Sequence, residues 1–225
     1  MITQTKNPNN LSTLPVRVHP QATIHELIAA RRSPRAFSAR PVEPSALASL
    51  FEAARWAPSS ANEQPWHFVV ATKADAAAYF ALSESLAEAN RRWAQRAPVL
   101  VLALAKSTYS RNGRPYEHSW YDVGQAVALL SVQATAMNLA VHQMGGFDGA
   151  KVQRLLSIPA EFTPVIIFAV GYPDQPESLP EDLQKRELAP RSRKPLEHFV
   201  FTEEWGKPSP HVSAKDSFST QPSTN

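Results

Sequence analysis

The sequence predicts a single layered domain that combines helices with strands, the α plus β class. Segments with apolar residues at three- and four-residue spacing alternate with short, almost wholly apolar runs, a pattern typical of helices that cover a sheet. The chain has 225 residues, of which 43% are hydrophobic and 19% are charged. This is enough for one substantial apolar core and too little to require two domains.

The N-terminal part of the chain contains three predicted elements. Residues 1–20 are polar, and we expect them to form a flexible arm. A capping box at Thr23–Glu26 opens a short helix that extends to about Arg31. Residues 44–57 place their apolar side chains on one helical face and predict a second helix, and after a proline-bounded break residues 66–72 predict a strand.

The middle of the chain predicts a helix, a strand and a longer helix. An alanine-rich helix is expected over 74–90 and a buried strand over 99–105. A turn-rich segment, 107–119, precedes a long helix that begins near Trp120. Its apolar face continues to Val141. Because this run carries almost no charge, we expect a central helix that is buried on most sides.

The C-terminal part predicts shorter elements. Residues 150–158 form a short helical pattern, and 163–173 predict a β-branched strand. A basic, proline-bounded loop then leads to a short apolar strand at 198–203. Residues 207–225 contain few apolar side chains, and we expect a disordered tail.

Composition excludes several classes of protein. The net charge is only +3 and the basic residues are scattered, so charge alone does not favour a nucleic-acid surface. The absence of cysteine excludes disulfides and thiolate catalysis and fits a reducing compartment. The N-terminus lacks a secretory signal, and the longest apolar runs, 97–105 and 164–171, are far shorter than the roughly 20 residues of a membrane helix. The histidines show no metal-ligand spacing. We therefore expect a soluble cytoplasmic protein with no metal, no nucleic acid and no membrane partner.

The stretch RRSPRAF, residues 31–37, places three arginines within five residues. Arg31, Arg32 and Arg35 are suited to forked contacts with a phosphate, and the Ser33 hydroxyl adds a short donor. The alternative is a solvated helix end, where the helix dipole favours cations. No glycine-rich phosphate-binding loop is present, so arginines would have to hold any bound phosphate.

Three further segments have patterns suited to a flat, charged ligand. The loop at 58–66 offers hydroxyls and amides to the edge of a heterocycle. The pair Gly145–Gly146 allows a backbone amide to approach a planar group closely. Arg191 and Arg193 repeat the basic chemistry near the other end of the chain. The respective alternatives are an ordinary turn, the C-cap of the long helix and a charged surface loop.

In this order and spacing the segments resemble the nitroreductase family of flavin enzymes. The resemblance extends from about Ile24 to Phe201 and depends on RRSPRAF, PSSANEQPWHFVV, DVGQAVALLSVQATAMNLAVHQMGGFD and PRSRKP. It implies a three-layer α-β-α fold with a mixed, mostly antiparallel sheet, in an FMN-binding domain at 21–206. It also implies a homodimer with FMN at the interface. The apolar strand at 198–203 would then be exchanged with the partner, which removes an exposed strand edge.

The resemblance implies an FMN site built from segments far apart in the sequence. The backbone N–H of Gly146 is the expected partner of flavin N5, and the family commonly has an acidic residue where Gly145 stands. Arg35 is expected beside N1 and O2, where reduction places negative charge. The loop that begins at Pro58 would be lent by the other subunit. The implied cofactor-binding residues are Arg31, Arg32, Ser33, Arg35, Pro58, Ser59, Ser60, Asn62, Asn90, Gly145, Gly146, Arg191 and Arg193.

The implied function is an NAD(P)H-dependent oxidoreductase. NAD(P)H would give hydride to N5 and leave, and a nitroaromatic, quinone or related acceptor would then be reduced in the same place, a ping-pong cycle without a catalytic side chain. Tyr116, His118 and Trp120 lie where the family varies its substrate lid and either contact the acceptor or simply pack. One alternative is a family member with another reaction, reductive dehalogenation or flavin destruction. The other is a non-enzymatic nucleic-acid binder that uses both arginine groups, which the modest net charge disfavours.

Overall fold

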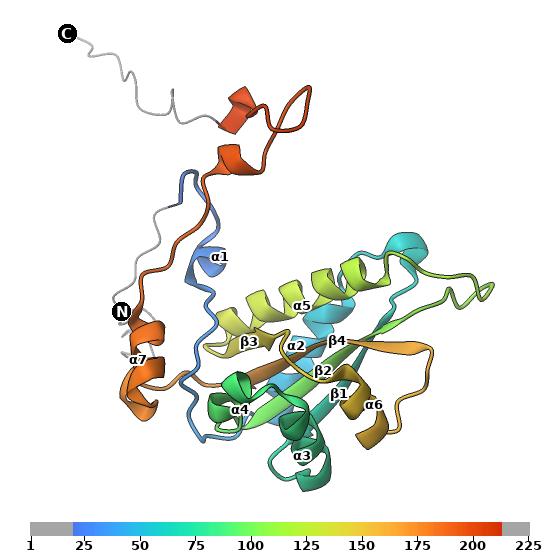
Figure 1. The fold of residues 1–225 in the computed structure, drawn as a ribbon, viewed down its shortest axis with the longest axis vertical. Coiled ribbons are helices and arrows are strands. Elements are labelled where there is room, and N and C mark those ends of the chain that lie inside the picture. Colours follow the sequence, from blue (N-terminus) through green and yellow to red (C-terminus); the bar gives the residue numbers. More distant parts are fainter. Residues whose placement is uncertain (1–19, 213–225) are drawn as a thin grey trace, which may run out of the picture.

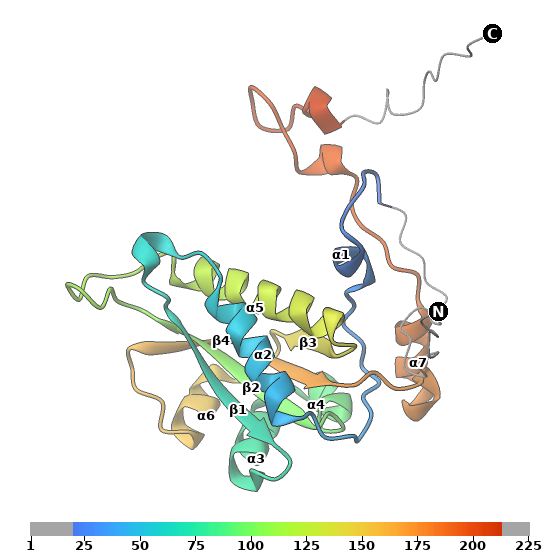
Figure 2. The same ribbon diagram turned by 180° about the vertical axis from the view of Figure 1, so that it is seen from behind.

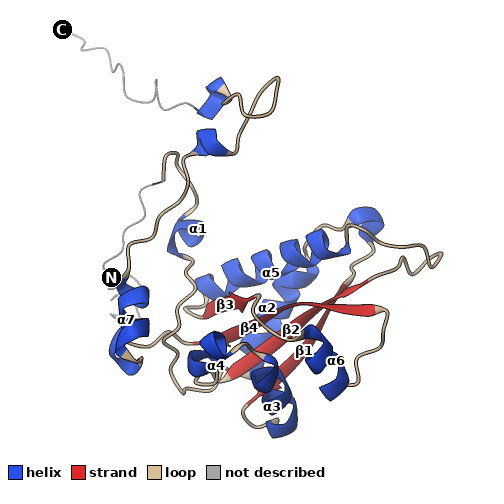
Figure 3. Cartoon of the chain, viewed as in Figure 1, coloured by secondary structure: helices blue, strands red, loops and turns tan. Residues whose placement is uncertain are grey.

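The computed structural model describes residues 20–212, and a four-stranded sheet lies at its centre (Figures 1 and 3). The strand order is β1-β2-β4-β3, and each of the three pairings in this sheet is antiparallel. The strands are β1 (Trp66–Thr72), β2 (Val99–Lys106), β3 (Ala140–Met144) and β4 (Phe162–Gly171).

Helices cover both faces of the sheet (Figures 1 and 2). On one face lie α2 (Pro44–Arg55) and α5 (Ser119–Ala136). On the other face lie α3 (Ala76–Ser85), α4 (Glu88–Ala94) and α6 (Gly149–Leu155). The three-layer α-β-α fold predicted from the sequence is therefore confirmed, and the sheet, expected to be mixed and mostly antiparallel, is antiparallel in all three pairings.

Strand β2 is buried along nearly its whole length because each of its faces meets a different layer of helices. Val99 and Val101 belong to the apolar cluster that α2 and α5 complete, whereas Leu100 and Leu102 belong to the cluster that α3, α4 and α6 complete. Successive side chains of a strand point to opposite faces. The unbroken apolar run therefore supplies two cores at once. The strands predicted at 66–72 and 163–173 are also present, as β1 and β4.

The helix predicted over 74–90 is interrupted, and α3 and α4 replace it. Leu86 has an extended backbone with a ψ of 142° and forms a β-bridge with Phe147. The N–H of Ala87 donates to the carbonyl of Gly146 at 2.9 Å. These contacts to the segment after β3 break the helix, and nothing in the local sequence indicates them.

The long helix ends earlier than predicted, and the strand β3 follows it. Helix α5 stops at Ala136. Asn138 has a φ of +57°, and the N–H of Leu139 donates to the carbonyl of Ala134 at 2.8 Å, which closes the helix end. The apolar pattern continues from α5 into β3 without a break, so spacing alone does not separate them. The expectation that this helix is buried on most sides is also wrong, because one face, with Tyr121 70% exposed, is open to solvent.

The first helix is shorter than predicted and has a different cap. Helix α1 (Glu26–Ala30) begins after His25, whose Nδ1 accepts the N–H of Leu27 at 3.2 Å. Thr23 lies outside the helix, so the predicted capping box is wrong. The imidazole provides the acceptor that the sequence analysis assigned to a hydroxyl.

The segment after β4 differs from the prediction in two places. Helix α7 (Glu181–Leu188) was not predicted. Residues 198–203 do not form a strand: a 3-10 turn ends at His198, and Phe201 makes only an isolated bridge with Pro208. This segment projects away from the sheet (Figure 1) and adds no strand to the sheet of β1 to β4. Residues 207–212 include a 3-10 turn. The rest of the predicted tail, like residues 1–19 of the predicted arm, lies outside the described residues.

Among residues 20–212, no helix is both long enough and apolar enough to span a bilayer.

Candidate functional site

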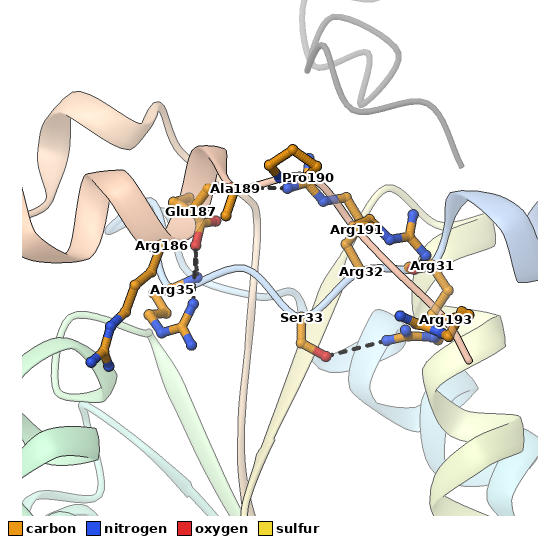
Figure 4. A pocket seen from close by; sticks show the side chains of 10 residues that line it. All are labelled: Arg31, Arg32, Ser33, Arg35, Arg186, Glu187, Ala189, Pro190, Arg191 and Arg193. Carbon is orange, nitrogen blue, oxygen red and sulfur yellow. Dashed lines mark hydrogen bonds and ion pairs between the residues drawn. The ribbon is translucent and has the colours of Figure 1, made fainter. Parts of the chain in front are cut away.

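Two segments from opposite ends of the chain meet at one pocket, which we call the arginine pocket (Figure 4). One segment is the loop between α1 and α2, and the other is the end of α7 with the residues that follow it. The pocket has a volume of about 260 Å³. Its lining consists of Arg31, Arg32, Ser33, Arg35, Arg186, Glu187, Ala189, Pro190, Arg191 and Arg193.

Hydrogen bonds from guanidinium groups to backbone carbonyls hold the two segments together. Arg191 donates through Nη1 to the carbonyl of Ala29 and through Nη2 to that of Arg31, both at 2.9 Å. These carbonyls lie at the C-terminal end of α1, where a cation is favoured. Arg32 Nη2 donates to the carbonyl of Glu187 at 3.1 Å. The pocket is thus a fixed meeting point of the two segments.

The arginine pocket carries a large excess of positive charge, with six arginines and one carboxylate. Burial lowers the pKa of Arg31, and the nearby charge of Arg193 lowers it further. Burial likewise lowers the pKa of Arg191, followed by the charges of Arg193, Arg31 and Arg32. Neighbouring cations that oppose one another's charge in this way favour the binding of an anion.

Two side chains that the sequence analysis did not predict fix the loop from which three of the arginines come. Glu187 has a side chain only 4% exposed; its Oε2 accepts the N–H of Arg35 at 3.0 Å and lies 3.7 Å from Arg35 Nη1. His142 Nδ1 lies 2.8 Å from the carbonyl oxygen of Pro34. Burial lowers the pKa of His142 to about 4, so its ring is neutral at pH 7 and Nδ1 is the donor.

The paired glycines follow β3, on the same side of the molecule as the arginine pocket. Gly146 lies four residues beyond His142, a distance of at most about 13 Å along an extended chain. The carbonyl of Gly146 accepts hydrogen bonds from Ala87 N–H at 2.9 Å and from Asn90 Nδ2 at 3.2 Å. A Cβ on Gly146 would lie 3.0 Å from Asn90 Nδ2. A side chain there would disturb this arrangement, whereas glycine leaves the backbone accessible.

The loop at 58–62 has an unusual backbone that a buried carboxylate supports. Ala61 and Asn62 both have a φ of +54°, a conformation that residues other than glycine rarely adopt. Asp122 in α5 is 2% exposed and accepts the N–H of Ser60 at 3.1 Å and the hydroxyl of Tyr116. Strained backbone that the surrounding structure holds in this way is concentrated at functional sites.

A second pocket of about 370 Å³ lies beside this loop. Its lining includes the predicted lid residue His118 together with Tyr121, which is not among the predicted site residues. Tyr116 is buried, and Trp120 is not among the lining residues. The lining residues are Pro58, Ser59, Ser60, His118, Tyr121, Asp122 and Gln125.

The predicted site residues therefore fall into two groups. The elements that carry the arginines, Ser33, Asn90 and the glycines are the loop after α1, the end of α7, α4 and the end of β3, and they lie toward the C-terminal end of α5 (Figures 1 and 2). The loop after α2 lies at the N-terminal end of α5. A helix of 18 residues is about 27 Å long. One chain does not bring the two groups together.

Of the side chains that the sequence analysis missed, Glu187 left the clearest signal. It is the single acidic residue in the basic stretch from 185 to 194, and an isolated carboxylate among cations indicates a specific pairing. His142 and Asp122 lie in apolar runs without such a signal. Within the described residues, no group of three or more His, Asp or Glu side chains is arranged to hold a metal ion.

Comparison with known proteins gives a consistent result. The profile of the Nitroreductase family matches residues 28–172. The "Putative NADH dehydrogenase/NAD(P)H nitroreductase" of Xanthomonas oryzae pv. oryzae is 29% identical over 172 residues, which cover 68% of this chain and 86% of that protein. Iodotyrosine deiodinase 1 of Rattus norvegicus is 27% identical over 190 residues, 73% of this chain and 66% of that protein.

Among solved structures, the crystal structure of an oxidoreductase containing FMN is similar to this one. It has a TM-score of 0.78 and 32% sequence identity, and the match covers 89% of this chain and 98% of that chain. The family match includes the segments that form the arginine loop, the 58–62 loop and the glycine pair. This chain belongs to the nitroreductase family.

Proposed function

We propose that this protein is an FMN-dependent oxidoreductase that takes hydride from NAD(P)H and delivers it to a small aromatic or quinone-like acceptor. The observation that supports this most directly is the arginine pocket, where guanidinium groups from both ends of the chain surround one small cavity. FMN carries a dianionic phosphate, and the pocket offers the charge and the forked donors that suit it. Residues 21–206 would form the flavin-binding domain.

The arginine pocket fits the phosphate end of FMN and not the whole molecule. Its volume of about 260 Å³ is below the roughly 300–1,000 Å³ of sites that enclose a complete small ligand. Arg31 donates to the exposed hydroxyl of Ser33, and Arg193 to a neighbouring carbonyl. Both guanidinium groups keep further donors for a phosphate, since each carries five N–H groups. Arg191 would add charge while it holds α1.

The glycine pair fits the ring end of FMN. Gly146 would offer its backbone N–H to N5. Asn90 uses its amide N–H₂ on the Gly146 carbonyl, which directs its own carbonyl oxygen as an acceptor toward a ring N–H. When bound, FMN supplies the centre that accepts and releases hydride. Arg35 would lower the free energy of the negative charge that reduction places on the ring.

A homodimer would complete the site. The loop at 58–62 lies at the N-terminal end of α5, a helix about 27 Å long, and the arginine pocket lies toward its other end, so a second subunit would have to bring its own loop to the flavin. Large apolar side chains are exposed on α5 and on the C-terminal segment, with Trp205 92% exposed. Exposed apolar surface of this kind marks protein interfaces. Light scattering should give twice the 24.8 kDa of one chain.

NAD(P)H is proposed as the hydride donor because the similar protein of Xanthomonas oryzae is named a "Putative NADH dehydrogenase/NAD(P)H nitroreductase". Donor and acceptor would occupy the same face of the flavin in turn. Tyr121 and His118, beside the 58–62 loop, would contact the acceptor. The cytoplasm suits a chain that contains no cysteine.

A second candidate reaction is reductive dehalogenation, which the similarity to iodotyrosine deiodinase 1 favours. The two candidates share the flavin site and differ in the acceptor. Oxidation of NAD(P)H under anaerobic conditions with a quinone or nitroaromatic, compared with release of iodide from a halotyrosine, separates them.

The absorption spectrum of the purified protein tests whether the protein binds FMN, on which the whole proposal depends. We expect flavin bands, and FMN in the supernatant after denaturation. Apoprotein should bind FMN more tightly than riboflavin, which lacks the phosphate. A colourless protein that takes up no FMN on reconstitution would exclude the proposed function.

A further inference from the structure

One peptide unit of the arginine loop is held from both sides by side chains of distant elements. The carbonyl of Pro34 accepts a hydrogen bond from His142 Nδ1 at 2.8 Å. The N–H of the next residue, Arg35, donates to Glu187 Oε2 at 3.0 Å. His142 belongs to β3 and Glu187 to α7, so the two bonds connect the sheet, the loop and the C-terminal helix.

The orientation of this peptide unit sets the direction of the pocket groups on either side of it. Pro34 is buried, and its ring fixes its φ. Ser33, as the residue before a proline, is kept out of the helical region. Ala36, on the other side, is fully buried. Much of the freedom that remains to Ser33 and Arg35 is therefore rotation of the Pro34–Arg35 peptide unit, which the two hydrogen bonds oppose.

The charge of Glu187 does not fit a simple anion site. Its carboxylate lines a pocket that otherwise collects cations, and a negative charge there opposes the binding of a phosphate. Its carbonyl oxygen, in addition, accepts from Arg32 Nη2 at 3.1 Å. Glu187 opposes the charge of an anionic ligand but contacts Arg32 and Arg35. Its role is therefore better explained as holding these two arginines in place.

The surroundings of His142 also favour a placing role. Its ring lies 4.3 Å from the ring of Trp93, centre to centre, and the cationic groups that face it are Arg31 and Arg35. At neutral pH the imidazole adds no charge to the pocket. Its polar contacts with the arginine loop are with the backbone of Pro34 and Ser33, so a change at His142 alters the loop and leaves the pocket's charge as it was.

We propose that His142 and Glu187 are positioning residues of the flavin site, which clamp the Pro34–Arg35 peptide unit so that Ser33 is directed at the phosphate position and Arg35 toward the ring position before the anion arrives. The inference rests on the proposed function, since the anion is the FMN phosphate. Groups that are already in place lose less freedom on binding. The clamp therefore raises the affinity for phosphate although one of its members carries a negative charge.

Two variants of Glu187 give opposite results if the clamp exists. E187Q keeps an oxygen that accepts the Arg35 N–H and removes the charge, so FMN should bind as tightly as to the wild type or more tightly. E187A removes both, and FMN should bind about tenfold more weakly even though the pocket is more positive. Fluorescence quenching of FMN measures both. If E187A binds FMN as tightly as E187Q does, Glu187 is only a counter-charge and the proposal is overturned.

A pair of variants at His142 tests the other half of the clamp. H142L removes the donor, and H142N restores an N–H at nearly the place of Nδ1. At pH 7.5 none of the three side chains is charged, so electrostatics are unchanged. We expect H142L to lose about tenfold in FMN affinity, a smaller factor for riboflavin, and H142N to recover most of the loss. Equal affinity of H142L and wild type for FMN contradicts the proposal.

Measurements on the apoprotein keep the test independent of the flavin. Hydrogen exchange of the Arg35 amide should be faster in E187A than in E187Q, and inorganic phosphate should raise the melting temperature of E187A less than that of the wild type. E181A, in the exposed part of α7, is the matched control and should match the wild type in each measurement.

If E187A does not fold, the two His142 variants decide. If wild-type protein binds neither FMN nor phosphate, the proposed function fails; if it binds both and the variants do not weaken binding, the clamp alone fails.

Discussion

Replacement of Arg191 tests two roles of the arginine pocket. Its hydrogen bonds hold two segments of the chain together, and its cations repel one another until an anion binds. In R191A the protein loses two hydrogen bonds of 2.9 Å from a charged donor to the carbonyls of Ala29 and Arg31. Bonds of this kind contribute about 1.5–3 kcal/mol each. The same change removes repulsion from Arg31 and Arg193, on the order of 1 kcal/mol for each half-exposed pair. The apoprotein should therefore lose about 1–4 kcal/mol of stability.

The effect of R191A should grow when the anion is present. A bound phosphate neutralises the repulsion, so the wild type gains stability on binding and the variant gains less. For a chain of this length, about 2–4 °C of melting temperature corresponds to 1 kcal/mol. We expect R191A to melt about 2–16 °C below the wild type as apoprotein, and the gap to widen with saturating FMN. Thermal unfolding monitored by circular dichroism measures both differences.

R191K separates charge from geometry. An ammonium group keeps the charge but cannot make a planar, two-armed contact with both carbonyls. We expect R191K to recover less than half of the stability lost in R191A. Two results would refute this reasoning: an R191A apoprotein that melts above the wild type, or an R191K variant that matches the wild type with and without FMN.

Three further outcomes follow from the structure. The pKa of His142 is about 4 in the folded protein against an ordinary 6.5, so the folded state binds fewer protons than the unfolded state. The contribution to stability is therefore full above pH 6.5 and falls toward pH 4 by up to about 1.4 kcal/mol per pH unit. Urea titrations of H142N should show a free energy of unfolding that depends less on pH over this range. D122A leaves the Ser60 N–H without its carboxylate and removes the acceptor of the buried Tyr116 hydroxyl. The variant should lose about 3–5 kcal/mol of unfolding free energy and become sensitive to proteases at 58–65. A loss below about 0.5 kcal/mol would contradict the support that we assign to this carboxylate. G146A places a Cβ 3.0 Å from Asn90 Nδ2, whereas the Cβ of G145A meets only Ile166 Cδ1 at 4.0 Å. Flavin titration should therefore find weaker binding to G146A than to G145A. Equal affinities would exclude a close approach of the flavin to the Gly146 backbone.

The central elements of the fold could be predicted from the sequence because they are defined by local pattern. The run at 99–105 is apolar on every residue, and both faces of β2 are buried. Errors occurred where distant contacts override the pattern. Leu86 and Ala87 have no helix-breaking character, but their contacts with the segment after β3 end the helix. The same holds for β3 itself, whose apolar residues extend the pattern of α5.

The candidate site shows the same division. The arginines could be predicted because three within five residues form a dense signal, and Arg191 and Arg193 form a second. The isolated carboxylate of Glu187 indicates a pairing but not its partner, and His142 leaves no local signal, because their contacts span 152 and 108 residues of sequence. Chemical type can be read along the chain, whereas the support of a functional group depends on which elements the fold brings beside it.

The length of α5 links the site to the oligomer. The glycine pair and the arginine pocket lie toward one end of this helix, and the 58–62 loop is fixed to the other end through Asp122. A rigid helix of about 27 Å prevents one chain from closing both halves around one flavin. In a two-fold dimer with antiparallel α5 helices, each end of one helix would lie near the opposite end of its partner, and two complete sites would form at once. The exposed side chains of α5, among them Trp120, Tyr121 and Leu129, would then be buried, so that loss of the dimer and loss of flavin would occur together.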